Sequence, residues 1–186
     1  MSGCSIVWIS SRNNKMPRKA RLDMKFHAYL FVDGSNSKGV GIGAWAAIAV
    51  SGDRRQLLYG LDNPTTISRC ELKPILEGLR WIRHTWVNSP GFRVLVTSDS
   101  EYTVKTLCGI YEKNKNKELW AAITTAQEGL DVTFQWRERN TLPYMELCDR
   151  ICGEVRVKWS GCVEASTCGL IKPDYIVPCY PIPEDL

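Results

Sequence analysis

Apolar residues along the chain follow two different periods, which divide it into expected strands and helices. Residues 26–32 form a short apolar run (F-H-A-Y-L-F-V) that stops at Asp33, and similar runs at 42–50 and 56–60 lie between turns containing glycine. Short apolar runs without a helical period are typical of buried strands. We therefore expect three strands in an antiparallel meander, with Asp33 at the end of the first.

The apolar spacing becomes helical after residue 65. Apolar residues between 71 and 82 recur every three or four positions, which predicts a helix beginning near Cys70 with Pro74 in its first turn. The elements expected after it are a strand at 92–97, helices at 101–107 and 118–130, a strand at 132–136 and a helix at 145–155. This order predicts an α/β fold whose sheet combines antiparallel and parallel strands, because strands one and four can pair through a crossover helix.

Charge separates the chain of 186 residues into three regions. The net charge is +4, but residues 1–25 carry six basic residues against Asp23, which is +5 and leaves −1 for the remainder. We expect a basic N-terminal extension (1–25), one folded domain (26–157) and a Cys- and Pro-containing tail (158–186). The extension is either a solvated tail or an arm that contacts phosphates, and the tail is a candidate docking segment.

The cysteines and the hydropathy bear on the compartment. No apolar run approaches the roughly 18 residues of a membrane span, and the N-terminus lacks the pattern of a signal peptide. The eight cysteines contain no C-x-x-C pair, which favours reduced thiols and a cytoplasmic or other reducing intracellular location. A zinc site formed by Cys152, Cys162, Cys168 and Cys179 is an alternative, although their spacing fits no standard ligand pattern.

Four acidic residues fall at places that can converge. Asp33 and Asp99 follow expected strands one and four, Glu71 opens the first helix and Asp149 lies in the last helix. Carboxylates gathered at one point repel each other unless cations neutralise them, and hard oxygen ligands select Mg²⁺ or Mn²⁺. Two such ions form the usual device for in-line attack on a phosphodiester.

These motifs together resemble the ribonuclease H family, type 1. The matching segments, in chain order, are Y-L-F-V-D-G-S (29–35), G-I-G-A-W-A (41–46), T-T-I-S-R-C-E-L (65–72), V-T-S-D-S-E-Y (96–102), V-T-F-Q-W (132–136) and E-L-C-D (146–149). The resemblance covers about residues 26–157 and implies a ribonuclease H-like fold. That fold is a five-stranded mixed sheet, with three antiparallel strands followed by two parallel ones, flanked by helices.

The resemblance also implies an activity and a site. It implies Mg²⁺-dependent hydrolysis of the RNA strand of RNA–DNA hybrids, with two ions held by Asp33, Glu71, Asp99 and Asp149. By the same resemblance Glu71 would lie nearest the scissile phosphate and the RNA 2′-hydroxyl. The candidate nucleic-acid-binding residues, in loops and turns beside the acids, are Ser35, Asn36, Thr66, Ser68, Arg69, Arg139 and Asn140. Arg69 is expected to brace the site or to pair with a carboxylate, in preference to reading a base.

The sequence departs from the family pattern at two places. Ile67 and Ser68 replace two asparagines that help to read the minor groove of the hybrid, and Ile67 has no polar side-chain atom. Residues 136–144 contain no histidine where the family usually has one, and Arg139 or Asn140 occupies the equivalent region. A general acid–base group contributes roughly 10²–10⁴-fold to a rate, so we expect a slower enzyme with an intact metal site.

Two other functions remain open. In the first, the domain is a non-catalytic module that binds nucleic acid or scaffolds a larger nucleoprotein assembly. In the second, it is a related nuclease that cuts DNA, similar to resolvases and transposases. The first alternative predicts that binding survives the loss of an acid. The second predicts cleavage of substrates made only of DNA.

Overall fold

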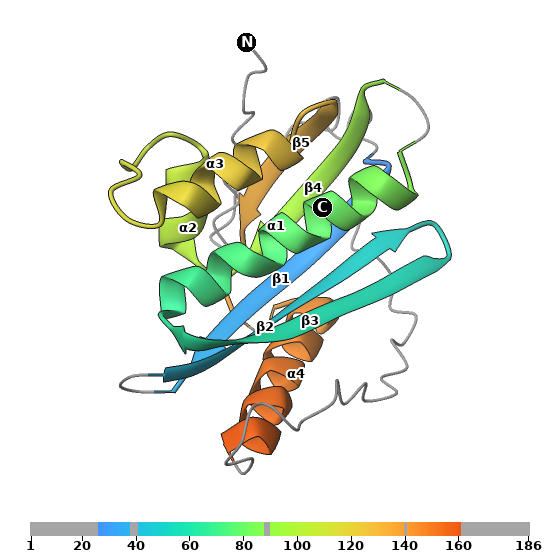
Figure 1. Cartoon of the computed structure of the whole chain (residues 1–186). Helices are drawn as coiled ribbons and strands as arrows, with labels where there is room; N and C mark the ends of the chain where they lie inside the picture. The colour runs from blue at the N-terminus through green and yellow to red at the C-terminus, as the bar shows by residue number, and fades with distance from the viewer. Residues whose placement is uncertain (1–25, 38–40, 88–89, 140, 161–186) are drawn as a thin grey trace.

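The computed structural model describes residues 26–37, 41–87, 90–139 and 141–160, and it contains a single sheet with helices on both faces (Figure 1). The elements are β1 (Ala28–Asn36), β2 (Gly41–Ser51), β3 (Arg54–Thr65), α1 (Ile67–Thr85), β4 (Phe92–Ser98), α2 (Glu101–Leu107), α3 (Lys117–Ala126), β5 (Leu130–Trp136) and α4 (Pro143–Ser160). The N-terminal extension and residues 161–186 of the tail lie outside the described residues.

The sheet has five strands in the order β3-β2-β1-β4-β5. The pairs β1–β2 and β2–β3 are antiparallel, whereas β1–β4 and β4–β5 are parallel. The predicted meander and the predicted pairing of strands one and four are both confirmed. This topology places the C-terminal ends of β1 and β4 side by side in the middle of the sheet.

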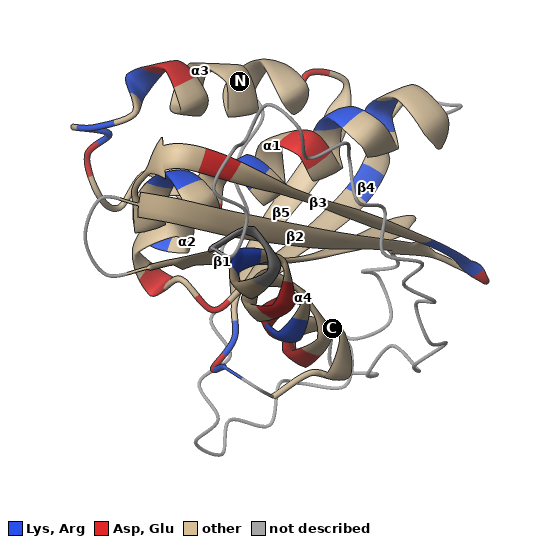
Figure 2. Cartoon of the chain, turned by 60° about the horizontal axis from the view of Figure 1, so that its bottom comes forward, with Lys and Arg blue, Asp and Glu red and all other residues tan. Residues whose placement is uncertain are grey.

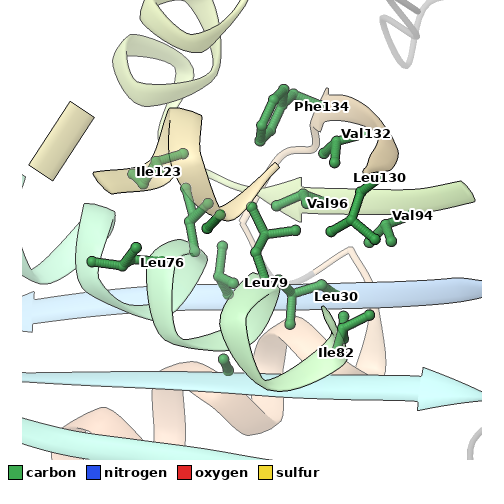
Figure 3. Close-up of a cluster of buried hydrophobic side chains, with 14 of the residues drawn as sticks. Leu30, Leu76, Leu79, Ile82, Val94, Val96, Ile123, Leu130, Val132 and Phe134 are labelled. Atoms are coloured by element: carbon green, nitrogen blue, oxygen red, sulfur yellow. The ribbon is translucent and has the colours of Figure 1, made fainter. Parts of the chain in front are cut away.

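Two apolar layers hold the helices against the sheet. On one face, α1 and α3 pack on residues that alternate along the central strands, among them Leu30, Val94 and Val96 (Figure 3). On the other face, α4 packs on Phe31, Ile48 and their neighbours on β1 and β2. Since the side chains of β1 and β2 alternate between these layers, both strands are covered by helices on both faces.

The boundaries of the first and third strands differ from the prediction. The strand β1 continues to Asn36, so Asp33 lies inside the strand instead of at its end. The strand β3 extends from Arg54 to Thr65, well beyond the predicted 56–60, because it pairs along most of β2. The apolar pattern did not predict this length, because polar residues interrupt it. They are tolerated since most residues of β3 are only half-buried at the edge of the sheet.

Helix α1 begins earlier than predicted. Thr66 is its N-cap, and its side chain accepts a hydrogen bond from the backbone N–H of Arg69. Pro74 therefore lies inside the helix and not in its first turn. Because proline has no N–H, the carbonyl of Cys70 lacks its usual helical donor.

The last three elements also shift at their ends. Helix α3 stops at Ala126 instead of 130, because Gly129 has a left-handed backbone (φ 80°) and Leu130 already belongs to β5. Helix α4 spans Pro143–Ser160, so the boundary predicted at 157 falls within it. Among the described residues, no helix is both long and apolar enough to cross a membrane.

Candidate active site

Asp33 and Asp99 come together through the register of two parallel strands. Val32 of β1 pairs with Ser98 of β4, and an aspartate follows each of them. Val32 faces the α1 layer, so the side chain of Asp33 faces the opposite layer, where α4 lies. The two carboxylates therefore share the end of the β1–β4 pair, as the sequence predicted.

A close backbone contact brings Glu71 to the same place. A Cβ at Gly34 would lie 2.4 Å from the carbonyl carbon of Cys70 and 2.6 Å from the backbone nitrogen of Glu71. No other residue type could occupy this position without moving β1 or α1. The absence of a side chain at Gly34 thus lets the helix that carries Glu71 lie directly on the strand that carries Asp33.

Two hydroxyl groups of the α2 segment hold the Glu71 carboxylate. Ser100 Oγ and Thr103 Oγ1 donate to Glu71 Oε2 at 2.6 and 2.9 Å. Ser100 is also the N-cap of α2, where its Oγ accepts from the backbone N–H of Thr103. Sequence reasoning missed both residues, although a serine directly before a predicted helix was a visible capping signal.

Helix α4 delivers Asp149 from the other face of the sheet. Two thiols one turn apart donate to carbonyl oxygens of β1, Cys148 to Phe31 and Cys152 to Asp33, each at 3.5 Å. Arg156 Nη1 donates to the carbonyl oxygen of Asn36 at 3.0 Å. These contacts fix α4 lengthwise along β1 and place Asp149 beside the other acids.

Arg139 bridges two of the four acids. Its Nη2 forms an ion pair with Asp149 Oδ1, and its Nε lies 3.9 Å from Asp99 Oδ2. The contact with Asp149 holds the pKa of the Arg139 guanidinium above its ordinary value. Arg139, one of the two residues predicted in the region of the family's histidine, therefore contacts two of the four acids directly.

The electrostatics of the acids follow from burial and mutual repulsion. Burial, followed by the charges of Asp99 and Asp149, raises the pKa of Asp33 to about 7, although Arg139 and the Gly34 N–H oppose this shift. Burial also raises the pKa of Glu71 against the effect of its two hydroxyl donors, and that of Asp99 against the effect of Arg139. The site thus holds more negative charge than its own cation neutralises.

Carboxylate oxygens are the ligand type that a hard divalent cation prefers. Asp33 is only 8% exposed, and its Oδ2 is buried without a hydrogen-bond partner among the described residues. Such an oxygen is costly while the carboxylate is charged, unless a cation or a proton neutralises it. No group of three or more His, Cys, Asp or Glu side chains in the described part of the chain is gathered closely enough to hold an ion as it stands.

The predicted nucleic-acid-binding residues lie around this site, with different surroundings. Asn36 Nδ2 donates to the carbonyl oxygen of Thr65 at 3.3 Å, while its Oδ1 is buried without a partner in the described structure. Thr66 is exposed, whereas Ser35 and Ser68 are half-buried. Their role in binding stays a prediction, and Asn140 lies outside the described residues.

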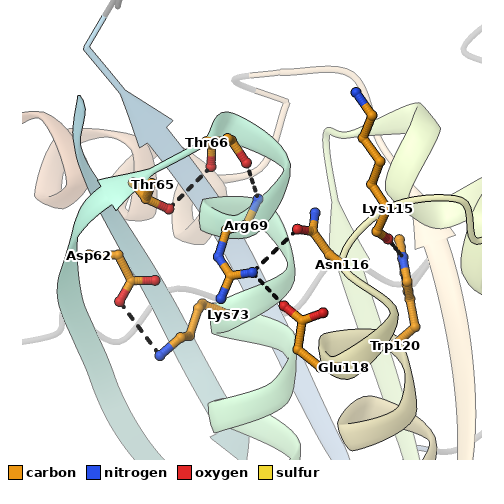
Figure 4. Close-up of polar contacts among 9 residues, drawn as sticks. All are labelled: Asp62, Thr65, Thr66, Arg69, Lys73, Lys115, Asn116, Glu118 and Trp120. Carbon is orange, nitrogen blue, oxygen red and sulfur yellow. Dashed lines mark hydrogen bonds and ion pairs between the residues drawn. The ribbon is translucent and has the colours of Figure 1, made fainter. Parts of the chain in front are cut away.

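Arg69 turns away from the acids toward α3. Its Nη1 donates to Glu118 Oε1 at 2.5 Å and to Asn116 Oδ1 at 3.3 Å (Figure 4). The expected pairing with a carboxylate is present, and it links the start of α1 to the start of α3. A nearby ion pair between Lys73 and Asp62 ties α1 to β3 in the same way.

The alternative zinc site gains no support from Cys152. Its thiol is fully buried against β1, where it donates to the carbonyl of Asp33, and burial raises its pKa. A thiol in this position is far from being a thiolate ligand. The three other cysteines of that prediction, Cys162, Cys168 and Cys179, lie outside the described residues.

Comparisons with known proteins place these features in context. The sequence profile described as RNase H matches residues 26–151. A Cupriavidus metallidurans protein named Ribonuclease H is 30% identical over 139 residues, which cover 66% of this chain and 90% of that protein.

Solved structures show the same fold. The N-terminal RNase H domain of a Mycobacterium tuberculosis protein, solved as a fusion with maltose-binding protein, aligns with a TM-score of 0.63 at 12% identity, covering 73% of this chain and 99% of that one. LC11-RNase H1, solved in complex with an RNA/DNA hybrid, aligns with a TM-score of 0.61 at 18% identity, covering 72% and 99%. The predicted family and fold are both confirmed.

Proposed function

Since this chain belongs to the RNase H family, we propose that it hydrolyses the RNA strand of RNA–DNA hybrids with divalent cations held by Asp33, Glu71, Asp99 and Asp149. The observation that carries the proposal is the buried, unpartnered oxygen of Asp33 among acids that repel it. Burial and repulsion make the charge of Asp33 unfavourable for folding, and such perturbed carboxylates cluster at functional sites. The hybrid bound to LC11-RNase H1 supports the choice of substrate.

The four acids would hold Mg²⁺ or Mn²⁺, two ions in the mechanism that we propose, and the ions would supply an activated water and neutralise the leaving oxygen. The chain's own residues prepare this site. Ser100 and Thr103 fix the orientation of Glu71. Arg139 lowers the repulsion between Asp99 and Asp149 before any cation arrives.

The test is a cleavage assay on the purified full-length protein. With Mg²⁺ or Mn²⁺, a hybrid labelled on its RNA strand should be cut, whereas duplex RNA and duplex DNA should stay intact. Asp33→Asn and Asp99→Asn should abolish cleavage, because each removes a charge that binds the cation. Asp131→Asn, which alters an exposed acid of β5, is the matched control and should cut normally.

A non-catalytic binding module is the second candidate. The ion pair between Arg139 and Asp149 favours it, because it neutralises part of the charge of the site without metal. In addition, no group of acids in the described residues is gathered closely enough to hold an ion as it stands. It predicts that the wild type binds the hybrid but leaves it intact with either cation. Cleavage of all-DNA duplexes would instead identify a DNA nuclease.

A further inference from the structure

Exposed apolar side chains lie on helix α2 and in the segment that follows it. Among the described residues, five large hydrophobic side chains are exposed, and three of them are Tyr102 (46% exposed), Ile110 (47%) and Tyr111 (43%). We call these three residues the tyrosine platform. Clustered apolar exposure beside a candidate active site is typical of a binding surface.

The backbone holds the platform in one conformation. Gly109 follows α2 with a left-handed φ of 77°. Its N–H donates to the carbonyl of Thr106 at 3.1 Å, and the N–H of Ile110 donates to the carbonyl of Lys105 at 2.9 Å. This pair of bonds is a Schellman motif, which folds Ile110 and Tyr111 back against the end of the helix.

The aromatic rings of the platform are already stacked on each other. The ring centroids of Tyr102 and Tyr111 are 5.9 Å apart at an interplanar angle of 26°. Lys105 Nζ lies 5.4 Å from the Tyr111 centroid and 2.7 Å from Glu101. Side chains ordered in this way lose little entropy when a further flat ring stacks on them.

Helix α2 connects the platform to the acids. Its inner side presents Ser100 and Thr103 to the carboxylate of Glu71, while its outer side presents Tyr102 and Lys105. The residues that hold Glu71 and the first residue of the platform therefore belong to the same short helical segment.

The charge next to the platform suits a polyanion. Lys113, Lys115 and Lys117 are exposed on the segment that leads into α3 (Figure 2). None of the three forms an ion pair with a carboxylate in the described ranges, whereas Glu101 and Glu118 are each paired with another basic residue. In this segment, Glu112 is then the one acidic residue that can offset the positive charge of the three lysines.

We propose that the tyrosine platform binds unpaired nucleotides of a single strand that continues beyond the hybrid, with bases stacked on Tyr102 and Tyr111 and phosphates facing the lysines. This inference rests on the proposed function for its substrate. Bases inside a duplex are covered by their neighbours, so only an unpaired base offers its face to an exposed ring. The lysines favour a nucleic acid over a protein partner.

The test measures binding in EDTA, so that no cleavage occurs. A blunt fluorescent hybrid is compared with hybrids that carry a single-stranded DNA overhang of about eight nucleotides at either end, within the usual site sizes. The full-length wild type should bind one overhung hybrid roughly tenfold more tightly than the blunt one. The double variant Tyr102→Ala/Tyr111→Ala should lose this preference, and Tyr102→Phe/Tyr111→Phe should keep it.

Val157→Ala, which changes an exposed apolar residue on α4, is the control and should behave as the wild type. The inference is overturned if the wild type binds blunt and overhung hybrids equally, or if the double alanine variant keeps the preference. It is also overturned if the alanine variant abolishes a wild-type dimer in sedimentation, because the occupant would then be a second copy.

The two proposals fail in different ways. A wild type that prefers the overhang through its tyrosines but never cuts with Mg²⁺ or Mn²⁺ would refute only the nuclease. A wild type that cuts the blunt hybrid but shows no overhang preference would refute only the platform.

Discussion

Asp33 combines burial with a missing hydrogen bond. It is 8% exposed, and its Oδ2 has no partner within the described structure. Its backbone is nevertheless fully engaged in the sheet, where it pairs with Ala46 of β2. The fold therefore holds this carboxylate in place regardless of its charge, and the charge itself opposes folding.

Because the negative charge of Asp33 opposes folding, the stability of the protein should depend on pH. Because the pKa of Asp33 is raised from 3.8 to about 7 in the folded state, the folded protein binds this proton more tightly than the unfolded chain does. The free energy of unfolding should therefore fall as pH rises from about 4 to about 7, by an amount on the order of 4 kcal/mol for this group. Urea unfolding in EDTA at pH 4 and pH 8 measures the difference.

Asp33→Asn should remove most of this pH dependence, and Asp131→Asn should leave it unchanged. Glu71 and Asp99 have pKa values shifted in the same direction, so a smaller slope should persist in Asp33→Asn. Mg²⁺ should stabilise the wild type more at pH 8 than at pH 5. A wild type that is more stable at pH 8 without metal would contradict the assignment.

Arg139 should compete with the cations that we propose. Its guanidinium is close to Asp99 and paired with Asp149, so removing its charge makes the site more negative. Arg139→Gln should bind Mn²⁺ several-fold more tightly in calorimetry, while the metal-free protein loses less than about 1 kcal/mol, because the ion pair is largely exposed. Arg150→Gln, an exposed neighbour on α4, is the charge-matched control. Weaker Mn²⁺ binding by Arg139→Gln would show instead that Arg139 orients Asp149 as a ligand.

At the scale of elements, the contact between β1 and α1 determines whether Glu71 lies close to Asp33. Gly34→Ala would place a methyl group 2.4 Å from backbone atoms of Cys70, and backbone cannot rotate away as a side chain can. We expect a loss of about 1–3 kcal/mol or more, together with weaker Mn²⁺ binding as Glu71 moves from Asp33. Thermal unfolding and calorimetry measure the two effects.

Gly153→Ala is the matched control for this substitution. Gly153 lies in α4, has no atom within 4 Å of an added Cβ, and has no left-handed backbone. Alanine there should leave Mn²⁺ binding unchanged and stabilise the helix by about 0.4–1 kcal/mol. Equal effects at both glycines would show that the contact between β1 and α1 is less tight than described.

The sequence predicted the kinds and order of elements well, and their ends less well. Apolar periodicity located α1, yet its start depended on Thr66, one of several residues able to cap a helix. The same periodicity extended α3 to 130, because Leu130 continues the helical spacing although it begins β5. Local patterns do not register the strand pairing that decides such ends.

At the scale of the site, the acids were predictable and their partners were not. Asp33 lies in a buried strand, Asp99 follows one, and the other two acids lie on helices, so topology brings the four carboxylates toward one place. The contacts of Ser100, Thr103 and Arg139 depend on loop and helix positions that no periodicity specifies. Gly34 was visible as a glycine, but its role required knowing which backbone lies against it.

For the whole molecule, charge is concentrated outside the described domain. Residues 1–25 carry a net charge of +5. Deleting them should weaken hybrid binding and reduce the dependence of log Kd on log salt concentration by up to about four, if most of these charges contact phosphates. Binding measured from low to moderate salt, in EDTA, tests this. An unchanged slope would identify the extension as a solvated tail.

The two thiols that bind α4 to β1 can also report how often α4 separates from the sheet. Cys148 and Cys152 are fully buried, and Asp149 lies between them on the helix. A thiol reagent can reach them only after α4 separates from the sheet, so their alkylation rate counts those separations. The same separation moves Asp149 away from the other acids. The alkylation rate of the two thiols therefore also reports how often the four acids come apart in the native protein.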